Sequence, residues 1–98
     1  MKRLYVDDER ECPKDWDLAR GYGEAIKKLS ETNYEIVSLD HDLGEWNYQT
    51  ERTGLTILNW LEERHYKGEH IPMILIHTQN AAVRRKMELA ANRLNREL

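Results

Sequence analysis

The chain has few of the residues on which disulfide-rich, collagen-like or membrane-spanning proteins depend. It contains one cysteine, two prolines, five glycines and no phenylalanine among 98 residues. A single cysteine excludes an internal disulfide and a metal site built from several cysteines, and it is typical of a reducing compartment. The sequence also lacks an apolar signal-peptide core and any run of about 18 apolar residues, so we expect a cytoplasmic protein without a membrane span.

The charge balance argues against a general nucleic-acid-binding protein. Lys and Arg number 15 against 18 Asp and Glu, which gives a net charge of −3 at pH 7, whereas phosphate affinity comes mostly from clustered basic side chains. A local basic excess over residues 84–96 is typical of a solvated helix face, with a nucleic-acid surface as the alternative. The length predicts one domain over residues 1–98, so fold and function share one core.

Strand-like and helix-like segments alternate along the chain. Apolar runs predict strands at 4–6, 34–39 and 71–76, and a weaker strand at 16–19. Apolar residues at helical spacing predict helices over 22–31, from 53–54 to 67, and from 80 nearly to 98. Residues 43–52 have no regular period and predict a loop over the strand ends. This alternation predicts an α/β fold, a small open parallel sheet of three or four strands with flanking helices.

Polar clusters follow three of the predicted strands, at the point where each strand ends. The clusters are Asp7-Asp8-Glu9-Arg10, Asp40-His41-Asp42 and His77-Thr78-Gln79-Asn80. Parallel strands end at one edge of a sheet, where ligands bind, so we expect these side chains to converge. The convergence predicts a functional site.

The first two clusters predict a divalent cation site. Asp7, Asp8 and Asp40 would repel one another unless a cation binds or a proton is taken up. Mg²⁺ fits best, because it prefers oxygen ligands and keeps waters that a phosphate can displace. The alternative is structural: Asp7 or Asp8 caps a loop, and Asp42 forms an Asx turn.

Two imidazoles are candidates for proton transfer. His41 lies between two aspartates, and His77 ends the most apolar strand. Together they would supply the acid and the base of a two-proton reaction. Hydrogen-bonded structural roles are the alternative for each. With Asp40, they are the candidate catalytic residues.

The remaining polar residues predict phosphate binding. Arg10 offers a planar guanidinium fork, and Thr78 offers a hydroxyl near the start of the last helix, where backbone N–H groups favour anions. Asn80 could polarise a phosphoryl oxygen, although capping that helix is the competing role. Trp46 and Tyr48 could stack a nucleobase or instead cover the core.

With these clusters in view, the chain resembles the cyclic-phosphate-processing receiver domains of bacteria and phages. The matching stretches are Leu4-Tyr5-Val6-Asp7-Asp8-Glu9-Arg10-Glu11-Cys12-Pro13, Leu39-Asp40-His41-Asp42-Leu43-Gly44, Thr53-Gly54 and His77-Thr78-Gln79-Asn80. The resemblance implies a receiver-like (flavodoxin-like) sheet and a ligand such as an RNA 2′,3′-cyclic phosphate end or a cyclic nucleotide.

The sequence also departs from ordinary receiver domains. In ordinary receiver domains, an acidic pair after the first strand binds Mg²⁺, and an aspartate after the third strand accepts phosphate. The resemblance matches Asp7 and Asp8 to the pair and Asp40 to the phosphate acceptor. This sequence ends after the helix that follows His77, so we expect a sheet that lacks the fifth strand and its lysine. A phosphorelay switch is therefore disfavoured, whereas His41 and the segment 77–80 favour cyclic-phosphate chemistry.

The sequence thus favours a metal-dependent phosphoesterase, a hydrolase that opens a cyclic phosphate. Two other hypotheses stay open: a binding module that sequesters a nucleotide signal unchanged, and a degenerate receiver domain that binds a protein partner. A second copy of the chain is a further candidate partner, through a sheet edge or the last helix.

Overall fold

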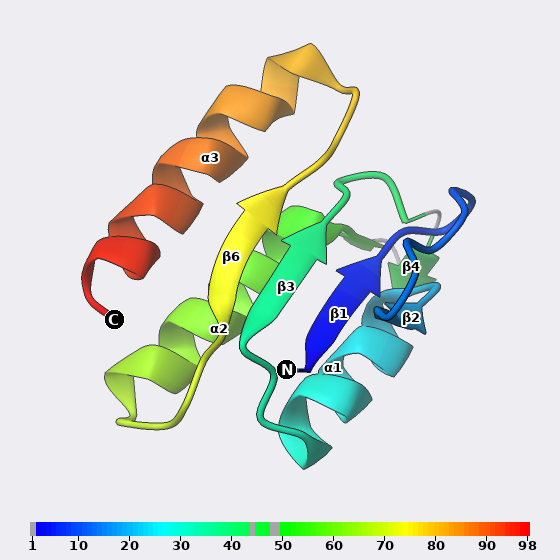
Figure 1. The fold of residues 1–98 in the computed structure, drawn as a ribbon. Coiled ribbons are helices and arrows are strands. Elements are labelled where there is room, and N and C mark those ends of the chain that lie inside the picture. Colours follow the sequence, from blue (N-terminus) through cyan, green and yellow to red (C-terminus); the bar gives the residue numbers. More distant parts are fainter. Residues whose placement is uncertain (1, 44, 48–49) are drawn as a thin grey trace.

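A four-stranded sheet flanked by three helices forms the body of the molecule. The computed structural model describes residues 2–43, 45–47 and 50–98 (Figure 1). The elements of the main sheet and its helices are β1 Arg3–Val6, β2 Asp17–Ala19, α1 Tyr22–Glu31, β3 Ile36–Leu39, α2 Gly54–Tyr66, β6 Met73–Ile76 and α3 Ala81–Arg96. Two further strands, β4 Glu45–Asn47 and β5 Thr50–Arg52, form a separate antiparallel pair.

The main sheet has the strand order β2-β1-β3-β6, and all of its neighbours are parallel. The chain therefore crosses from β2 to β3 and from β3 to β6 in the same direction. Right-handed crossovers of this kind place both connecting helices on one face, and Figure 1 shows α2 behind β3 and β6. The predicted receiver-like parallel sheet with flanking helices is confirmed.

The apolar core lies between this face and the helices. Alternate strand residues point toward the helices, and Leu4, Val6, Val37 and Leu39 are fully buried. The helices contribute their apolar stripes to the same cluster, with Ala25, Leu29, Ile57, Leu58, Leu61, Met87, Ala91 and Leu94 as members. None of the three helices in the described part of the chain is long and apolar enough to cross a membrane.

The opposite face of the sheet is open near β6. Met73 and Leu75 are 48% and 45% exposed, while Ile74 between them is buried. Parallel sheets are usually covered on both faces. On this side, β6 instead presents apolar side chains to the exterior.

Two expectations differ in detail from the structure, and a third is not tested by it. The segment predicted as a loop contains the β4–β5 pair, because strands of three residues are too short to show a period. β3 and β6 begin two residues later than expected, and Pro72, which cannot donate to a strand ladder, precedes β6. Tyr48 and the side chain of Trp46 lie outside the described residues, so their stacking role stays a prediction.

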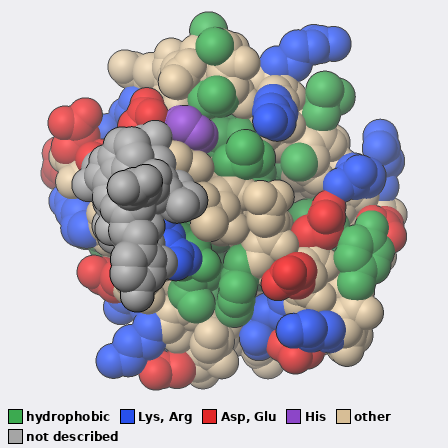
Figure 2. All heavy atoms as spheres, turned by 180° about the vertical axis from the view of Figure 1, so that it is seen from behind, with side chains coloured by type: hydrophobic (Ala, Val, Ile, Leu, Met, Phe, Trp, Pro, Cys, Tyr) green, Lys and Arg blue, Asp and Glu red, His purple; other side chains and the backbone are tan. Residues whose placement is uncertain are grey.

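Charges of both signs are spread over the surface. Seen from behind, basic and acidic side chains lie interspersed around the rim of the molecule (Figure 2). On α3, Arg84 pairs with Glu88, and Arg93 pairs with Glu62 of α2. These pairs agree with a solvated face for the basic C-terminal segment.

The free edge of β6 is held by a side chain of α3. Asn95 Oδ1 accepts a hydrogen bond from the backbone N–H of Ile74 at 2.8 Å. Asn95 Nδ2 donates to the carbonyl oxygen of Ile74, also at 2.8 Å. The carboxamide therefore satisfies both backbone groups of one edge residue, as a neighbouring strand would.

We expect Asn95→Ala to destabilise the protein by about 1–3 kcal/mol, because two hydrogen bonds to a part-buried peptide group are lost. The matched control is Asn92→Ala, which removes an exposed asparagine from the same helix. Urea unfolding measures both. Equal stability of the two variants would show that Asn95 does not secure the edge.

Candidate metal centre

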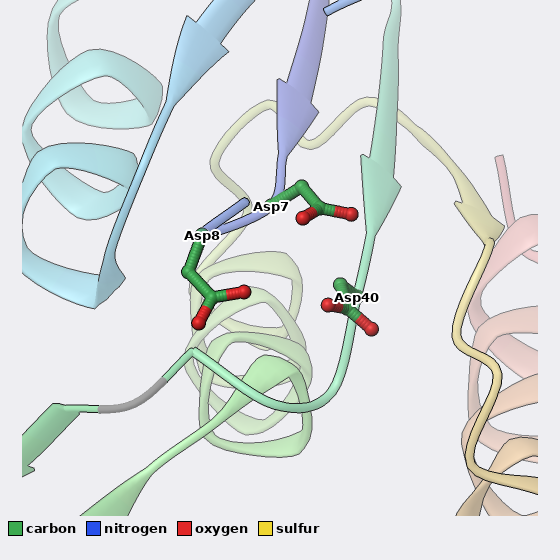
Figure 3. A group of neighbouring side chains, drawn as sticks. All are labelled: Asp7, Asp8 and Asp40. Atoms are coloured by element: carbon green, nitrogen blue, oxygen red, sulfur yellow. The ribbon is translucent and has the colours of Figure 1, made fainter. Parts of the chain in front are cut away.

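Three carboxylates meet where β1 and β3 end. Val6 pairs with Leu39 in the sheet, so the residues that follow these two, Asp7 and Asp40, continue side by side. One carboxylate oxygen from each of Asp7, Asp8 and Asp40 lies within 4.8 Å of the others. Asp7 and Asp40 are buried, and Asp8 is exposed. Figure 3 shows the three side chains gathered at the carboxyl edge of the strands.

The carboxylate of Asp7 is fully buried and accepts four hydrogen bonds. Oδ1 accepts from the backbone N–H groups of Glu9 and Arg10, at 3.0 and 2.9 Å. Oδ2 accepts from the Arg10 guanidinium at 2.7 Å and from Nε2 of His77 at 2.9 Å. Burial alone would raise the pKa of Asp7, but these donors outweigh it and lower the pKa to about 2.

Arg10 supplies a positive charge between two of the carboxylates. Its Nη1 atom lies 2.7 Å from Asp7 Oδ2 and 3.6 Å from Asp40 Oδ2. The neighbouring Arg20 holds the loop by donating to the carbonyl oxygen of Arg10 at 2.7 Å. The positive charge of the guanidinium thus reduces the repulsion between the carboxylates of Asp7 and Asp40.

The donor set fits a divalent metal ion. Three carboxylates from two strand ends offer hard oxygen ligands, which Mg²⁺, Ca²⁺ and Mn²⁺ prefer. Asp7 already accepts four hydrogen bonds, so a metal ion that bound its Oδ2 would take the place of the Arg10 guanidinium, the cation that now lies against Asp7 and Asp40. Asp7, Asp8 and Asp40 could therefore hold a metal ion at this edge.

His77 lies against Asp7 on the open side of the sheet. Its Nδ1 atom is 2.7 Å from Oγ of Ser38, and its ring is stacked on Tyr5 with centroids 4.2 Å apart and an interplanar angle of 8°. Burial lowers the pKa of His77 and outweighs the opposite effect of Asp7. Both nitrogens of the imidazole are engaged by the protein.

His41 is arranged differently. Its Nδ1 atom is 2.9 Å from Oδ1 of the exposed Asp42, and its own side chain is 14% exposed. The backbone N–H of His41 donates to Asp40 Oδ1 at 2.8 Å. A carboxylate only accepts hydrogen bonds, so Nδ1 carries a proton, and in the neutral tautomer Nε2 then has the lone pair.

Gly54 allows α2 to approach the carboxylates closely. Its N–H donates to the carbonyl oxygen of His41 at 3.0 Å. A Cβ atom at Gly54 would lie 1.9 Å from the carbonyl oxygen of Asp40 and 2.8 Å from Cε of Met87. Only glycine fits this contact. The preceding Thr53 caps α2 through a capping box with Thr56.

The segment after His77 reaches the same edge, but its side chains are used in another way than expected. Thr78 is 1% exposed, and its hydroxyl oxygen accepts the N–H of Asn80 at 3.1 Å. Asn80 stands at the N-cap position of α3, yet its side chain makes no capping hydrogen bond. Asn80 thus has the N-cap position given as its structural role, but without a capping hydrogen bond from its carboxamide.

The comparison with protein-family models shows to which family the chain belongs. The model of the cyclic-phosphate processing receiver domain matches residues 2–93. The chain belongs to this family. No curated protein and no solved structure matches it.

Two contributors to this receiver domain's site were missed by the sequence reasoning. Ser38 lies within an apolar run and Tyr5 within a short strand, so neither stands out as a polar cluster. What identifies them as part of the site is the sheet register, which pairs Tyr5 with Ser38. The strand pattern then places both on the same face as His77, but only once the strand order is known.

We expect Gly54→Ala to destabilise this receiver domain by about 1–3 kcal/mol and to weaken divalent cation binding, because a methyl group forces α2 away from Asp40. Gly23→Ala is the matched control, since a Cβ there meets nothing within 4 Å. Thermal unfolding and calorimetric Mg²⁺ titration provide the two measurements. A Gly54→Ala variant as stable as Gly23→Ala would contradict the close contact.

The lowered pKa of Asp7 also makes the stability of the domain depend on pH. A carboxyl with a pKa of 3.8 unfolded and about 2 folded contributes stability above pH 3.8, which is lost as the pH falls through these values. The loss amounts to about 2 kcal/mol. In Asp7→Asn we expect lower stability at pH 7 and a flatter acid limb, measured by urea unfolding between pH 5 and the acid transition. An unchanged acid limb would refute this assignment.

Proposed function

We propose that this domain is a phosphoesterase that opens a cyclic phosphate, either at an RNA 2′,3′-cyclic phosphate end or in a cyclic nucleotide or oligonucleotide signal. The observation that carries the proposal is the meeting of three carboxylates with a guanidinium and two imidazoles at one sheet edge. Phosphate-ester chemistry uses groups of these kinds for cation binding, phosphate binding and proton transfer. The family supports a ligand that contains a cyclic phosphate.

Asp7, Asp8 and Asp40 are the residues that would hold Mg²⁺. The bound ion would supply positive charge to the phosphoryl oxygens as negative charge builds up on them. Asp8 is the exposed member of the set, so it is the ligand nearest to solvent. Asp7 and Asp40 are fixed by hydrogen bonds from the loops that follow their strands.

Arg10 is placed to bind the phosphate. Its side chain is 31% exposed and already spans two carboxylates of the site, so part of its fork faces the exterior. A planar guanidinium binds two phosphate oxygens side by side, which a lysine cannot do. Asn80 adds a carboxamide at the start of α3, while the buried Thr78 supports that turn and would reach phosphate only if the turn opened.

His41 is our candidate for the acid–base group. Its Nδ1–H is directed at Asp42, which leaves the lone pair of Nε2 to accept a proton. In the hydrolysis, the oxygen of water forms a bond to phosphorus and the bond from phosphorus to the ribose oxygen breaks. Nε2 would take the proton that the water loses and return one to the departing oxygen.

His77 has a different part in this proposal. Both of its ring nitrogens are engaged, one by Asp7 and the other by Ser38. Proton transfer to substrate would first require one of these hydrogen bonds to break. We therefore infer that His77 stabilises the orientation of Asp7 rather than sharing the proton transfer with His41.

The assay is incubation of the purified domain and Mg²⁺ with RNA that ends in a 2′,3′-cyclic phosphate and, separately, with a cyclic dinucleotide. We expect a ring-opened product from at least one of them, detected by mass spectrometry, and no product with EDTA. Asp8→Asn should bind Mg²⁺ more weakly and need a higher Mg²⁺ concentration for activity. His41→Gln should lower turnover by about 10²–10⁴-fold. His65→Gln is the matched control. His65 is in the last turn of α2 and lies near Glu97, which follows α3, and in the described part of the chain it makes no contact with the carboxylates of the site.

The proposal fails if both substrates stay intact. Recovery of a bound but chemically unaltered nucleotide would then indicate a module that sequesters its ligand. Labelling of Asp40 by acetyl phosphate would indicate a receiver-type phosphoacceptor instead.

A further inference from the structure

Ser38 is a polar residue within β3 whose side chain is buried beneath His77. The residue is 6% exposed, and its hydroxyl oxygen lies 2.7 Å from Nδ1 of His77. The other ring nitrogen, Nε2, lies 2.9 Å from Oδ2 of Asp7. Ser38, His77 and Asp7, from three different strands or strand ends, thus form one continuous chain of hydrogen bonds.

The direction of each hydrogen bond follows from the chemistry of the groups. Both oxygens of the Asp7 carboxylate face donors, and a carboxylate only accepts, so Nε2 of His77 carries a proton. A neutral imidazole carries one N–H and one lone pair, so with the proton on Nε2 the lone pair is on Nδ1, 2.7 Å from the Ser38 hydroxyl. The hydroxyl of Ser38 therefore donates to Nδ1.

This arrangement permits one orientation of the imidazole. Half a turn of the ring about its bond to Cβ would put carbon atoms at both positions, so each hydrogen bond opposes the turn. Tyr5 fixes the plane of the ring by stacking on it at 4.2 Å. Ser38 therefore contributes one of the two hydrogen bonds that keep Nε2 of His77 facing Asp7.

We propose that Ser38 is a positioning residue, which acts through His77 to hold the carboxylate of Asp7 in the orientation that a divalent cation requires. Removal of a group that hydrogen-bonds a metal ligand directly, as His77 does Asp7, typically changes metal affinity or activity by about 10- to 100-fold, and Ser38 acts one hydrogen bond further from the ligand. The effect on turnover rests on the proposed function. The orientation of His77 and the affinity for Mg²⁺ do not depend on which substrate is used.

The same three residue types form the catalytic triad of serine hydrolases, so a nucleophilic serine is the competing assignment. A nucleophile must be open to its substrate. Ser38 is covered by the ring to which it donates, and that ring is itself stacked on Tyr5. The burial of Ser38 therefore favours positioning over covalent catalysis.

The test compares Ser38→Ala with Ser38→Thr, which restores a hydroxyl in a strand. Ser30→Ala is the matched control, because the Ser30 hydroxyl donates to Ile26 within α1. We expect Ser38→Ala to bind Mg²⁺ about 10-fold more weakly by calorimetry, the lower end of the range for direct partners of a ligand, and to lose turnover in proportion. Ser38→Thr should recover most of both, and Ser30→Ala should match the parent chain.

A spectroscopic measurement on the unsubstituted protein needs no variant to fold. ¹⁵N correlation spectra of the imidazoles at pH 7 should show His77 as a single tautomer with its proton on Nε2. In Ser38→Ala the signals of this ring should broaden or shift. A proton on Nδ1 in the unsubstituted protein, unchanged Mg²⁺ affinity in a folded Ser38→Ala variant, or phosphoserine at position 38 after incubation with substrate would each overturn the proposal.

These outcomes separate the inference from the proposed function. Weaker Mg²⁺ binding in Ser38→Ala with both cyclic phosphates left intact would support the role of Ser38 and refute the phosphoesterase. Ring opening that Ser38→Ala leaves unaffected would support the phosphoesterase and refute the role of Ser38.

Discussion

The buried carboxylate of Asp7 is the interaction on which the site depends. A charge with no exposed surface is costly to desolvate unless hydrogen bonds compensate it, and here four donors do so. They come from the loop after β1 and from the end of β6, so one side chain joins segments that are far apart in the sequence. Removing any donor would leave part of the charge uncompensated, and this couples the loop and the end of β6 to the stability of the fold.

The one-sided arrangement of the helices explains the chemistry on the other side of the sheet. Because both crossovers pass behind the strands, residues such as Leu39 are buried in an apolar core, while their neighbours face outward. Ser38 is one of these neighbours, and it is covered by the ring of His77 rather than by a helix. A hydroxyl at the centre of a strand is therefore stable here, since an imidazole nitrogen satisfies it.

Much of the fold was predictable, because the patterns that define it are local. The predicted helix 22–31 coincides with α1, and the clusters at Asp7, Asp40 and His77 do reach one edge. What could not be predicted depends on contacts between distant segments. The hydrogen bond from Ser38 to His77 joins residues 39 positions apart, and no periodicity reveals it. The contact of Gly54 with Asp40 likewise requires the docking of α2 to be known.

The carboxamide of Asn95 has a consequence for association between molecules. An edge strand normally offers its free N–H and C=O groups to any extended chain that approaches, which is how sheets grow into larger assemblies. In β6 the groups of Ile74, near the middle of the strand, are already taken. A second chain cannot add a continuous ladder along that side without first displacing α3. The carboxamide of Asn95 therefore protects the β6 border of the sheet against extension.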